Sequence, residues 1–267
     1  SGYGAYGFKD HRWKYSGTLT YSFNKRDYVV WEFPKHFISA TYSYDVMSPM
    51  DKFLFTDKDN VFVSFKTTTV DQMSYMRDVA INYELETPTG FGVKSMLRHR
   101  NDEPTGNLKY WANNSSADKM PLPNEKPIHD ITTAEASVTL RYAPGEAFVN
   151  SKQRRIPVSL DAPIFTLTHT AGFKGVLGGE YNFNRTEASI WKRVWLPSSW
   201  GKVDISLKGG AEWNTVPFPL LILPEANLSY ITQRETFCLI NNMEFLNDRF
   251  ASLSLSYDMN GKLCNRI

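Results

Sequence analysis

Runs in which apolar residues alternate with small polar residues recur along this sequence, and they constrain its backbone more than any other feature. Successive side chains of a β-strand point to opposite faces, so such a run has one apolar and one polar face. Clear examples cover residues 203–208 and 252–257. In the second run Leu253, Leu255 and Tyr257 share one face, and serines occupy the positions between them. The sequence therefore predicts an all-β protein made of amphipathic strands.

Thirteen strands are predicted from this alternation, and many of them are about ten residues long, the length that crosses a bilayer when a strand is tilted. They cover residues 3–9, 14–23, 36–46, 60–68, 76–86, 90–100, 106–112, 131–142, 163–173, 177–192, 200–213, 233–246 and 249–259. A membrane-spanning helix needs about 20 apolar residues. The longest apolar stretch, residues 216–223, is much shorter and contains two prolines.

The number of amphipathic strands, their modest content of Val, Ile and Leu, and the aromatic residues near their ends favour a membrane protein over a soluble two-layer protein. We predict an antiparallel transmembrane β-barrel of outer-membrane type that forms one domain over residues 1–267, as part of a larger barrel. In this arrangement Val203, Ile205, Leu207, Leu253, Leu255 and Tyr257 face outward. The predicted inward residues are Asp204, Ser206, Ser252, Ser254 and Ser256.

The sequence contains 14 Tyr and 7 Trp, and rings of this kind suit an interface that is apolar on one side and wet on the other. Trp191, Trp195 and Trp200 flank the turn at Pro197, and Trp213 ends the next predicted strand. We expect these four tryptophans to lie at a membrane interface, although core tryptophans of a β-sandwich would give the same pattern. The formal net charge of +2 provides no strong basic field for nucleic acid.

The connections between the predicted strands are of two kinds, as in outer-membrane barrels. Long polar segments cover residues 101–130 and 143–162, and we expect the first of them to be exposed. Asn247-Asp248 reads as a tight turn that pairs residues 233–246 with residues 249–259. This pairing places Cys238 opposite residues 255–257, so no disulfide with the distant Cys264 is expected.

No motif in the sequence points to catalysis, a metal or a cofactor. Gly2, Gly4 and Gly7 match the dinucleotide-binding pattern, but no strand precedes them and no helix follows. The histidines lack the spacing of a zinc site or of a catalytic pair, and we expect that alanine at any one of them leaves function intact. They are His11, His36, His99, His129 and His169.

Several segments from residue 163 onward resemble one known family. They are Tyr181-Asn182-Phe183, Trp191-Lys192-Arg193, residues 217–221, residues 242–253 and Asn265-Arg266-Ile267. The sequence is similar there to the C-terminal barrel region of Bacteroidota outer-membrane proteins that carry an N-terminal carboxypeptidase regulatory-like domain and a domain of unknown function. The resemblance implies an outer-membrane barrel without an established activity. The N-terminal domain and the later strands of that family are missing, so we expect this chain to be part of a longer one.

The family-like turn motif has its own physical interpretation. Asn247 and Asp248 make the turn, and Arg249 can pair with Glu244 or Asp248 or bind lipid headgroups. We expect this motif to be structural, because an exposed ion pair contributes at most about 1 kcal/mol.

The predicted function is that of a non-catalytic binding or scaffold component of a cell-envelope assembly in the Gram-negative outer membrane. Its expected partners are outer-membrane lipid and other envelope proteins, with no cofactor and no nucleic acid. Two alternatives stay open. One is an outer-membrane channel or secretion pore, in which charges such as Arg141, Asp204 and Lys208 set selectivity. The other is a soluble β-sandwich that binds carbohydrate through its aromatic surface.

Overall fold

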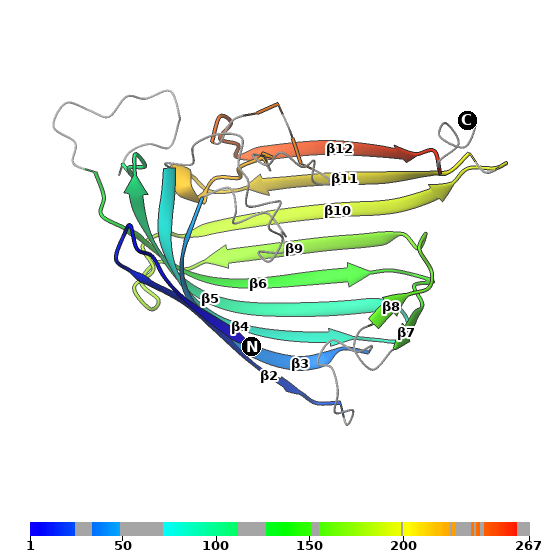
Figure 1. The fold of residues 1–267 in the computed structure, drawn as a ribbon, viewed down its shortest axis with the longest axis horizontal. Coiled ribbons are helices and arrows are strands. Elements are labelled where there is room, and N and C mark those ends of the chain that lie inside the picture. Colours follow the sequence, from blue (N-terminus) through cyan, green and yellow to red (C-terminus); the bar gives the residue numbers. More distant parts are fainter. Residues whose placement is uncertain are drawn as a thin grey trace.

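The computed structural model shows one large antiparallel sheet and a separate two-stranded sheet (Figure 1). It describes residues 1–24, 34–48, 72–111, 127–150, 155–198, 200–224, 226–227, 236–237, 239–240 and 243–260. The strands of the main sheet are β1 (Gly2–Tyr6), β2 (Trp13–Ser22), β3 (His36–Met47), β4 (Gln72–Glu86), β5 (Phe91–Gly106), β6 (Ile131–Tyr142), β9 (Ile164–Gly172), β10 (Phe183–Trp195), β11 (Lys202–Glu212) and β12 (Arg249–Asp258). The small sheet pairs β7 (Phe148–Asn150) with β8 (Arg155–Pro157).

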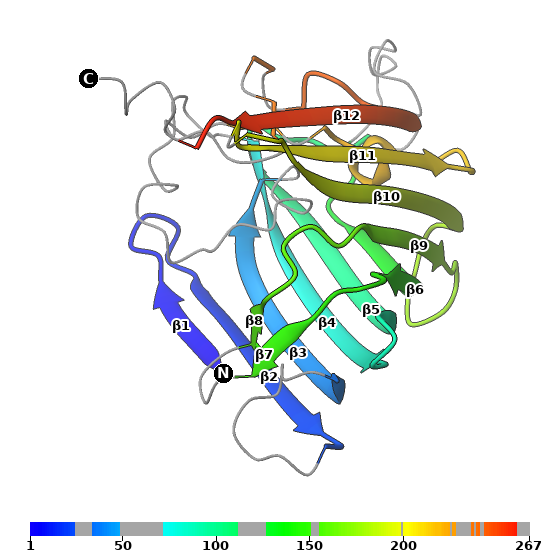
Figure 2. The same ribbon diagram turned by 90° about the vertical axis from the view of Figure 1, so that its right-hand side faces the viewer.

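Each strand of the main sheet pairs with the next main-sheet strand along the chain, from β1 through to β12. Figure 2 shows the sheet curling strongly, with β1 and β12 at the two ends of the curve. Among the described strands, no pairing joins β12 to β1, so the closed barrel predicted from the sequence is not found. The two packed layers of a sandwich are not found among these strands either, because ten of them belong to one sheet.

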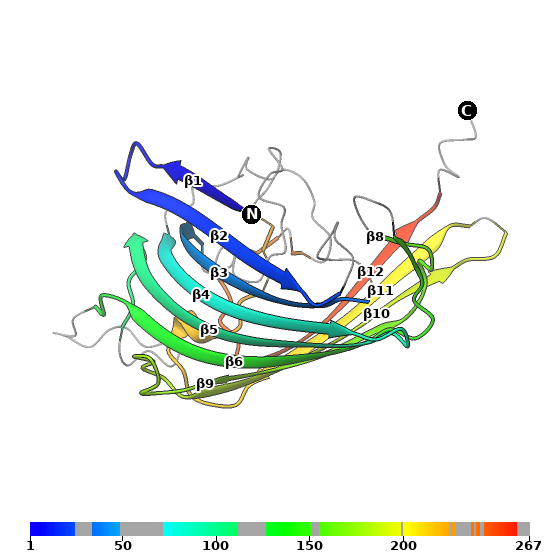
Figure 3. The same cartoon turned by 90° about the horizontal axis from the view of Figure 1, so that it is seen from below.

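The alternation places most large apolar strand residues on one side of the curved sheet, which we call the outer face. The cross-strand register gives rows such as Phe165, Ile190, Leu207 and Leu253, which are neighbours on four successive strands. The opposite side, here called the inner face, carries the positions between them and lines a hollow that six strands share. Figure 3 shows this side as the concave side of the sheet. The shared exposed face predicted for Leu253, Leu255 and Tyr257 is confirmed.

The buried core lies at one end of the strands, where β1 connects to β2, β9 to β10 and β11 to β12. We call this end the β1–β2 end. There the 3₁₀ helix η2 (Phe218–Leu220) and its flanking residues fold against the inner face. Phe183 of β10 packs with Val216, Leu220 and Leu221. A second cluster joins Leu108, Tyr110 and Ile131, with Phe218 packed against it. The hydrophobic core therefore closes one end of the hollow.

Three strand predictions are wrong. Residues 106–112 form no separate strand, because β5 continues without a break to Gly106. β10 begins only at Phe183, six residues later than predicted, because turns occupy the preceding residues. β12 pairs with β11 and not with residues 233–246, of which the described part contributes only an isolated bridge at Phe237. The small strands β7 and β8 fall in a segment predicted as loop.

The long segment 101–130 is only partly the exposed loop that the sequence predicts. Its first six residues belong to β5, and Tyr110 is fully buried. The rest of this loop, the predicted strand 60–68 and both cysteines lie largely or wholly outside the described residues. The glycine pattern at residues 2–7 lies on β1 and its turn, and no helix follows it. No helix among the described residues has the length and hydropathy needed to cross a membrane.

Candidate functional site: an apolar outer face around a polar trough

The outer face leaves large apolar side chains uncovered along the whole sheet. Leu19 of β2, Leu97 of β5 and Leu253 of β12 expose 80%, 61% and 63% of their surface. Exposed outer-face residues on the strands between them include Ile38, Ile81, Val138, Leu140, Leu167, Ile190 and Leu207. An exposed apolar face shared by this many strands is unusual for a water-soluble monomer and marks a surface for a membrane, a partner or a ligand.

Aromatic residues border this face at both ends of the strands. Near the β1–β2 end lie Trp13 and Tyr15 of β2, and the opposite end of the same strand carries Tyr21. Tyr75 and Tyr83 lie on the same face of β4, eight residues apart, but Tyr75 is buried beneath Arg12 of the β1–β2 turn. At the end away from the β1–β2 turn, Phe91, Tyr142 and Phe165 are register partners on three adjacent strands. The outer face thus has an aliphatic middle and aromatic margins.

The four tryptophans predicted at an interface divide between the two faces. Trp213 exposes 62% of its surface beyond the end of β11, and Trp200 exposes 54% in the β10–β11 turn. Trp191 shares the inner face with Arg193, whose guanidinium lies 5.5 Å from its ring centroid. Trp195 follows on the same side, with Arg193 at 5.7 Å, and is half exposed.

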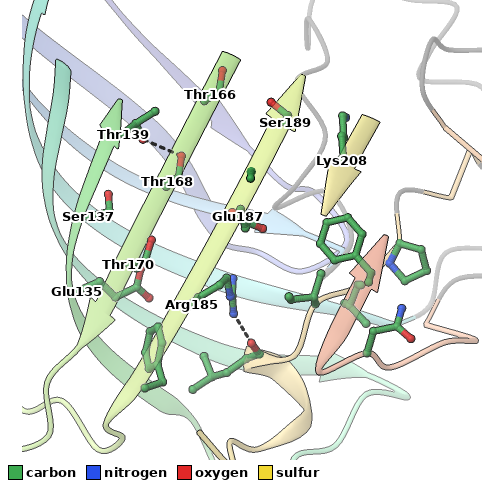
Figure 4. A pocket seen from close by; sticks show the side chains of 18 of the residues that line it. Glu135, Ser137, Thr139, Thr166, Thr168, Thr170, Arg185, Glu187, Ser189 and Lys208 are labelled. Atoms are coloured by element: carbon green, nitrogen blue, oxygen red, sulfur yellow. Dashed lines mark hydrogen bonds between the residues drawn. The ribbon is translucent and has the colours of Figure 1, made fainter. Parts of the chain in front are cut away.

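The inner face lines a hollow of about 710 Å³, here called the trough (Figure 4). Its lining comes from β5, β6, β9, β10, β11 and β12, together with residues outside the main-sheet strands: Pro219, Leu220, Ile222, Leu223, Pro224, Phe237 and Asn247. Seven hydroxyl residues belong to the lining, and two of them, Thr139 and Thr168, are hydrogen-bonded at 3.0 Å; apolar side chains such as Phe183, Leu220 and Phe250 line the β1–β2 end. The other hydroxyl residues of the lining are Ser137, Thr166, Thr170, Ser189 and Ser252.

Ion pairs within the trough wall offset most of its basic charge. Asp78 lies 3.4 Å from Arg98 and 3.9 Å from Arg100. Arg185 pairs with Glu212 at 3.2 Å and also donates to the Leu220 carbonyl, which ties the end segment to the wall. The remaining charges of the lining have both signs. The trough is therefore hydroxyl-rich and nearly neutral.

A further ion pair spans adjacent strands on the inner face, at the far end from the β1–β2 turn. Arg193 donates two hydrogen bonds to Asp204, at 2.6 and 2.8 Å, and both side chains are largely buried. The parallel pair of N–H···O bonds is the strong geometry for an arginine and a carboxylate. It fixes the register of β10 against β11.

The β1–β2 turn folds back onto the outer side of β4 through a polar network. Arg12 makes two 3.2 Å hydrogen bonds to Glu103 and lies 4.2 Å from the centroid of the Tyr75 ring. Asp10 accepts from Lys14 at 2.7 Å and from the Tyr75 hydroxyl at 2.5 Å. These two donors, Lys14 first, hold the pKa of the Asp10 carboxyl well below its usual range.

The family-like turn motif does not form the predicted hairpin. Asn247 is paired with Ile222 through two backbone hydrogen bonds, and the backbone N–H of Glu212 donates to the Asp248 carbonyl. Arg249 begins β12 on the outer face, opposite Ala211, and is exposed. Among the described residues, no carboxylate of Glu244 or Asp248 comes within 4.0 Å of its guanidinium.

The histidines lie apart from one another, each in its own surroundings. His36 stacks on Phe23 with ring centroids 4.6 Å apart. His99 contacts the Leu177 carbonyl, His169 contacts the Thr186 hydroxyl, and His129 is exposed beside Asp130. Within the described ranges, no cluster of three or more His, Cys, Asp or Glu residues could hold a metal.

The sequence predicted the strands that form the trough but not the contacts between the residues of its wall. Neither the pairing of Arg98 and Arg100 with Asp78 nor the insertion of residues 219–224 has a local sequence signal. Only the polar residues that alternate with apolar ones in each strand, such as Thr166, Thr168 and Thr170, could have indicated a shared inner surface.

The fold and its two faces define an all-β protein with one large, curved antiparallel sheet. All 267 residues match the family described as "Family of unknown function (DUF5686) C-terminal domain", and the chain belongs to that family. Neither a curated protein nor a solved structure matches the sequence.

Proposed function

We propose that this chain forms part of the wall of an outer-membrane β-barrel, with its outer face in lipid and its trough in contact with water. The observation that carries the proposal is the outer face, which has an exposed aliphatic middle and, on β2, the exposed rings of Tyr15 and Tyr21 toward its two ends. Transmembrane barrels have this arrangement. The lengths of β2 and β12, ten residues each, suit a tilted strand that crosses a bilayer.

Among the described strands, β1 and β12 each pair on one side only, which supports a larger barrel. An unpaired backbone N–H or C=O in the hydrocarbon costs several kcal/mol, so spanning sheets in membranes are closed. The proposal therefore includes further strands beside these two edges. The likeness to Bacteroidota outer-membrane proteins in the segments from residue 163 onward favours the same assignment.

Within the envelope, the proposed role is that of a non-catalytic binding or scaffold component that holds a polar guest or partner segment in the trough. The hydroxyl-rich and nearly neutral wall suits an uncharged polar surface. A second candidate is a transport pore, which the 710 Å³ volume of the trough favours. A pore would give ion conductance across a planar bilayer, whereas a scaffold with a filled lumen would not.

Leu97 and Met96 provide a test of the lipid-facing assignment, because they are adjacent on β5 and lie on opposite faces. Each is replaced by cysteine in a background with Cys238→Ser and Cys264→Ser, and a nitroxide label is attached in vesicles. We expect the label at residue 97 to be relaxed by oxygen, which concentrates in lipid, and the label at residue 96 by a water-soluble nickel complex. Equal accessibility of both labels to the nickel complex would contradict the proposal.

A further inference from the structure

The outer faces of the ten main-sheet strands carry four charged residues, which is few for a surface of this size. They are Arg77 of β4, Glu103 of β5, Lys192 of β10 and Arg249 of β12. Glu103 accepts both hydrogen bonds from Arg12, and Lys192 donates to the Asp161 carbonyl at 2.6 Å. Arg77 and Arg249 are both exposed, and among the described residues no carboxylate oxygen lies within 4.0 Å of either. Arg77 and Arg249 are therefore exposed cations without a carboxylate partner among the described residues, on a mostly apolar face.

Tyrosine rings surround Arg77 on its own face. Its guanidinium carbon lies 5.7 Å from the centroid of the Tyr44 ring. The Tyr15 ring is 5.9 Å from Tyr44 and 5.7 Å from Tyr42, and the Tyr15 and Tyr42 hydroxyls are 3.4 Å apart. Tyrosine places an apolar ring and a hydrogen-bonding hydroxyl side by side, which suits the boundary between lipid and water.

Arg249 lies in comparable surroundings at the other edge of the sheet. It faces Ala211, and two residues further along lies Trp213, an exposed ring whose indole N–H donates to the Thr186 hydroxyl at 2.9 Å. Both arginines thus stand beside interfacial aromatic residues near the β1–β2 ends of their strands.

The register of the sheet allows the two arginines to lie at the same level along the membrane normal. The row of cross-strand partners that begins at Arg249 reaches β4 at Tyr83, six residues beyond Arg77. Six residues are about 20 Å along a strand, and the six steps between strands are about 29 Å across the sheet. The heights coincide if the strands are tilted by about 35°, which is within the range of transmembrane barrels. The intermediate partners are Ala211, Thr186, His169, Val138 and Ser95.

We propose that Arg77 and Arg249 bind phosphate groups of membrane lipids and mark the headgroup level at the β1–β2 end of the sheet. The inference rests on the proposed membrane location. An arginine on a lipid-facing strand costs about 2–4 kcal/mol at the bilayer midplane but about 0–1 kcal/mol near the interface. Guanidinium and phosphate form paired, charge-assisted hydrogen bonds, and the neighbouring tyrosine hydroxyls provide further donors.

The test measures contact between arginine carbon and lipid phosphorus by solid-state NMR. The protein carries ¹³C at the guanidinium carbons of arginine and is reconstituted into phosphatidylglycerol bilayers. We expect phosphorus to dephase the guanidinium signals of Arg77 and Arg249, which R77Q and R249Q remove in turn. R77K and R249K remove the same guanidinium signals but keep the charge, and we expect them to leave insertion into the bilayer unchanged.

One further sample separates lipid phosphate from free phosphate, and one further measurement separates insertion from phosphate contact. In bilayers of an uncharged galactolipid with added inorganic phosphate, we expect no dephasing; equal dephasing there would overturn the lipid source. Vesicle flotation is measured on every sample. Protein that floats with phosphatidylglycerol vesicles while neither arginine is dephased would overturn this inference and leave the proposed function standing. Protein that does not float at all would overturn both.

Discussion

At the scale of single residues, Leu167 and Thr168 are adjacent on β9 but lie on opposite faces of the sheet. Leu167 exposes 46% of its surface on the outer face of β9, whereas Thr168 lines the trough between Thr139 and Glu187. The sequence predicted this division from the alternation alone, because the period of a strand is fixed by its backbone. It could not predict that Thr168 is hydrogen-bonded to Thr139, since that contact depends on the register between β6 and β9.

Arginine at these two positions should have unequal effects. We expect Leu167→Arg to lower the free energy of unfolding in bilayers by about 2–4 kcal/mol if residue 167 lies near the midplane. Thr168→Arg should have a much smaller effect, because the new cation lies in the trough beside Glu187. Reversible denaturant unfolding in vesicles measures both values. The opposite order would contradict the assignment of the two faces.

The Arg193–Asp204 pair should stabilise the contact between β10 and β11. Asp204→Asn removes the charge but not the shape of the acceptor, and we expect it to lower the free energy of unfolding by about 1–3 kcal/mol. Glu187→Gln, on the same face of β10, is the matched control, since no ion pair of Glu187 is seen among the described residues. Similar losses of unfolding free energy in both variants would show that the Arg193–Asp204 pair contributes no more to stability than the Glu187 carboxylate does.

At the scale of elements, the alternation located most main-sheet strands but not every partner. β12 pairs with β11 although residues 233–246 also alternate, because a period of two identifies a strand without identifying its neighbour. What separates the two possibilities is long-range packing. Residues 216–221 pack on Phe183, and Ile222 bridges to Asn247, which brings the start of β12 beside the end of β11.

Gly172 allows the end of the trough to close. A Cβ atom at this position would lie 2.1 Å from the Phe183 ring, which packs across the strand against Gly172. We expect Gly172→Ala to displace Phe183 from Val216 and Leu220 and to lower the free energy of unfolding by about 1–3 kcal/mol.

A smaller side chain at residue 183 provides the control for this steric account. Phe183→Leu should cost stability in the wild-type background, but less in the presence of Gly172→Ala. A double-mutant cycle of unfolding free energies measures the coupling between the two positions. Strictly additive effects would mean that glycine is required at residue 172 for its backbone conformation and not because the Phe183 ring packs closely against it.

At the scale of the whole molecule, the exposed apolar surface lies on the outside and most of the buried core lies at one end. Under the proposed membrane location, this exposed outer face disfavours a monomer in plain water. We expect the protein to be monodisperse in detergent above its critical micelle concentration and to associate when the detergent is removed, as measured by light scattering. A monodisperse protein after detergent removal would contradict the membrane assignment and favour a soluble role.

The strand order has a consequence for the kinetics of assembly. Because every main-sheet strand pairs with its successor, the sheet can grow one hairpin at a time without threading any segment through a finished part. Such nearest-neighbour pairing has a low contact order for a sheet of ten strands, so closing each loop costs less entropy than in a sheet with distant partners. At every stage the last strand to arrive offers its open backbone edge as the template for the next.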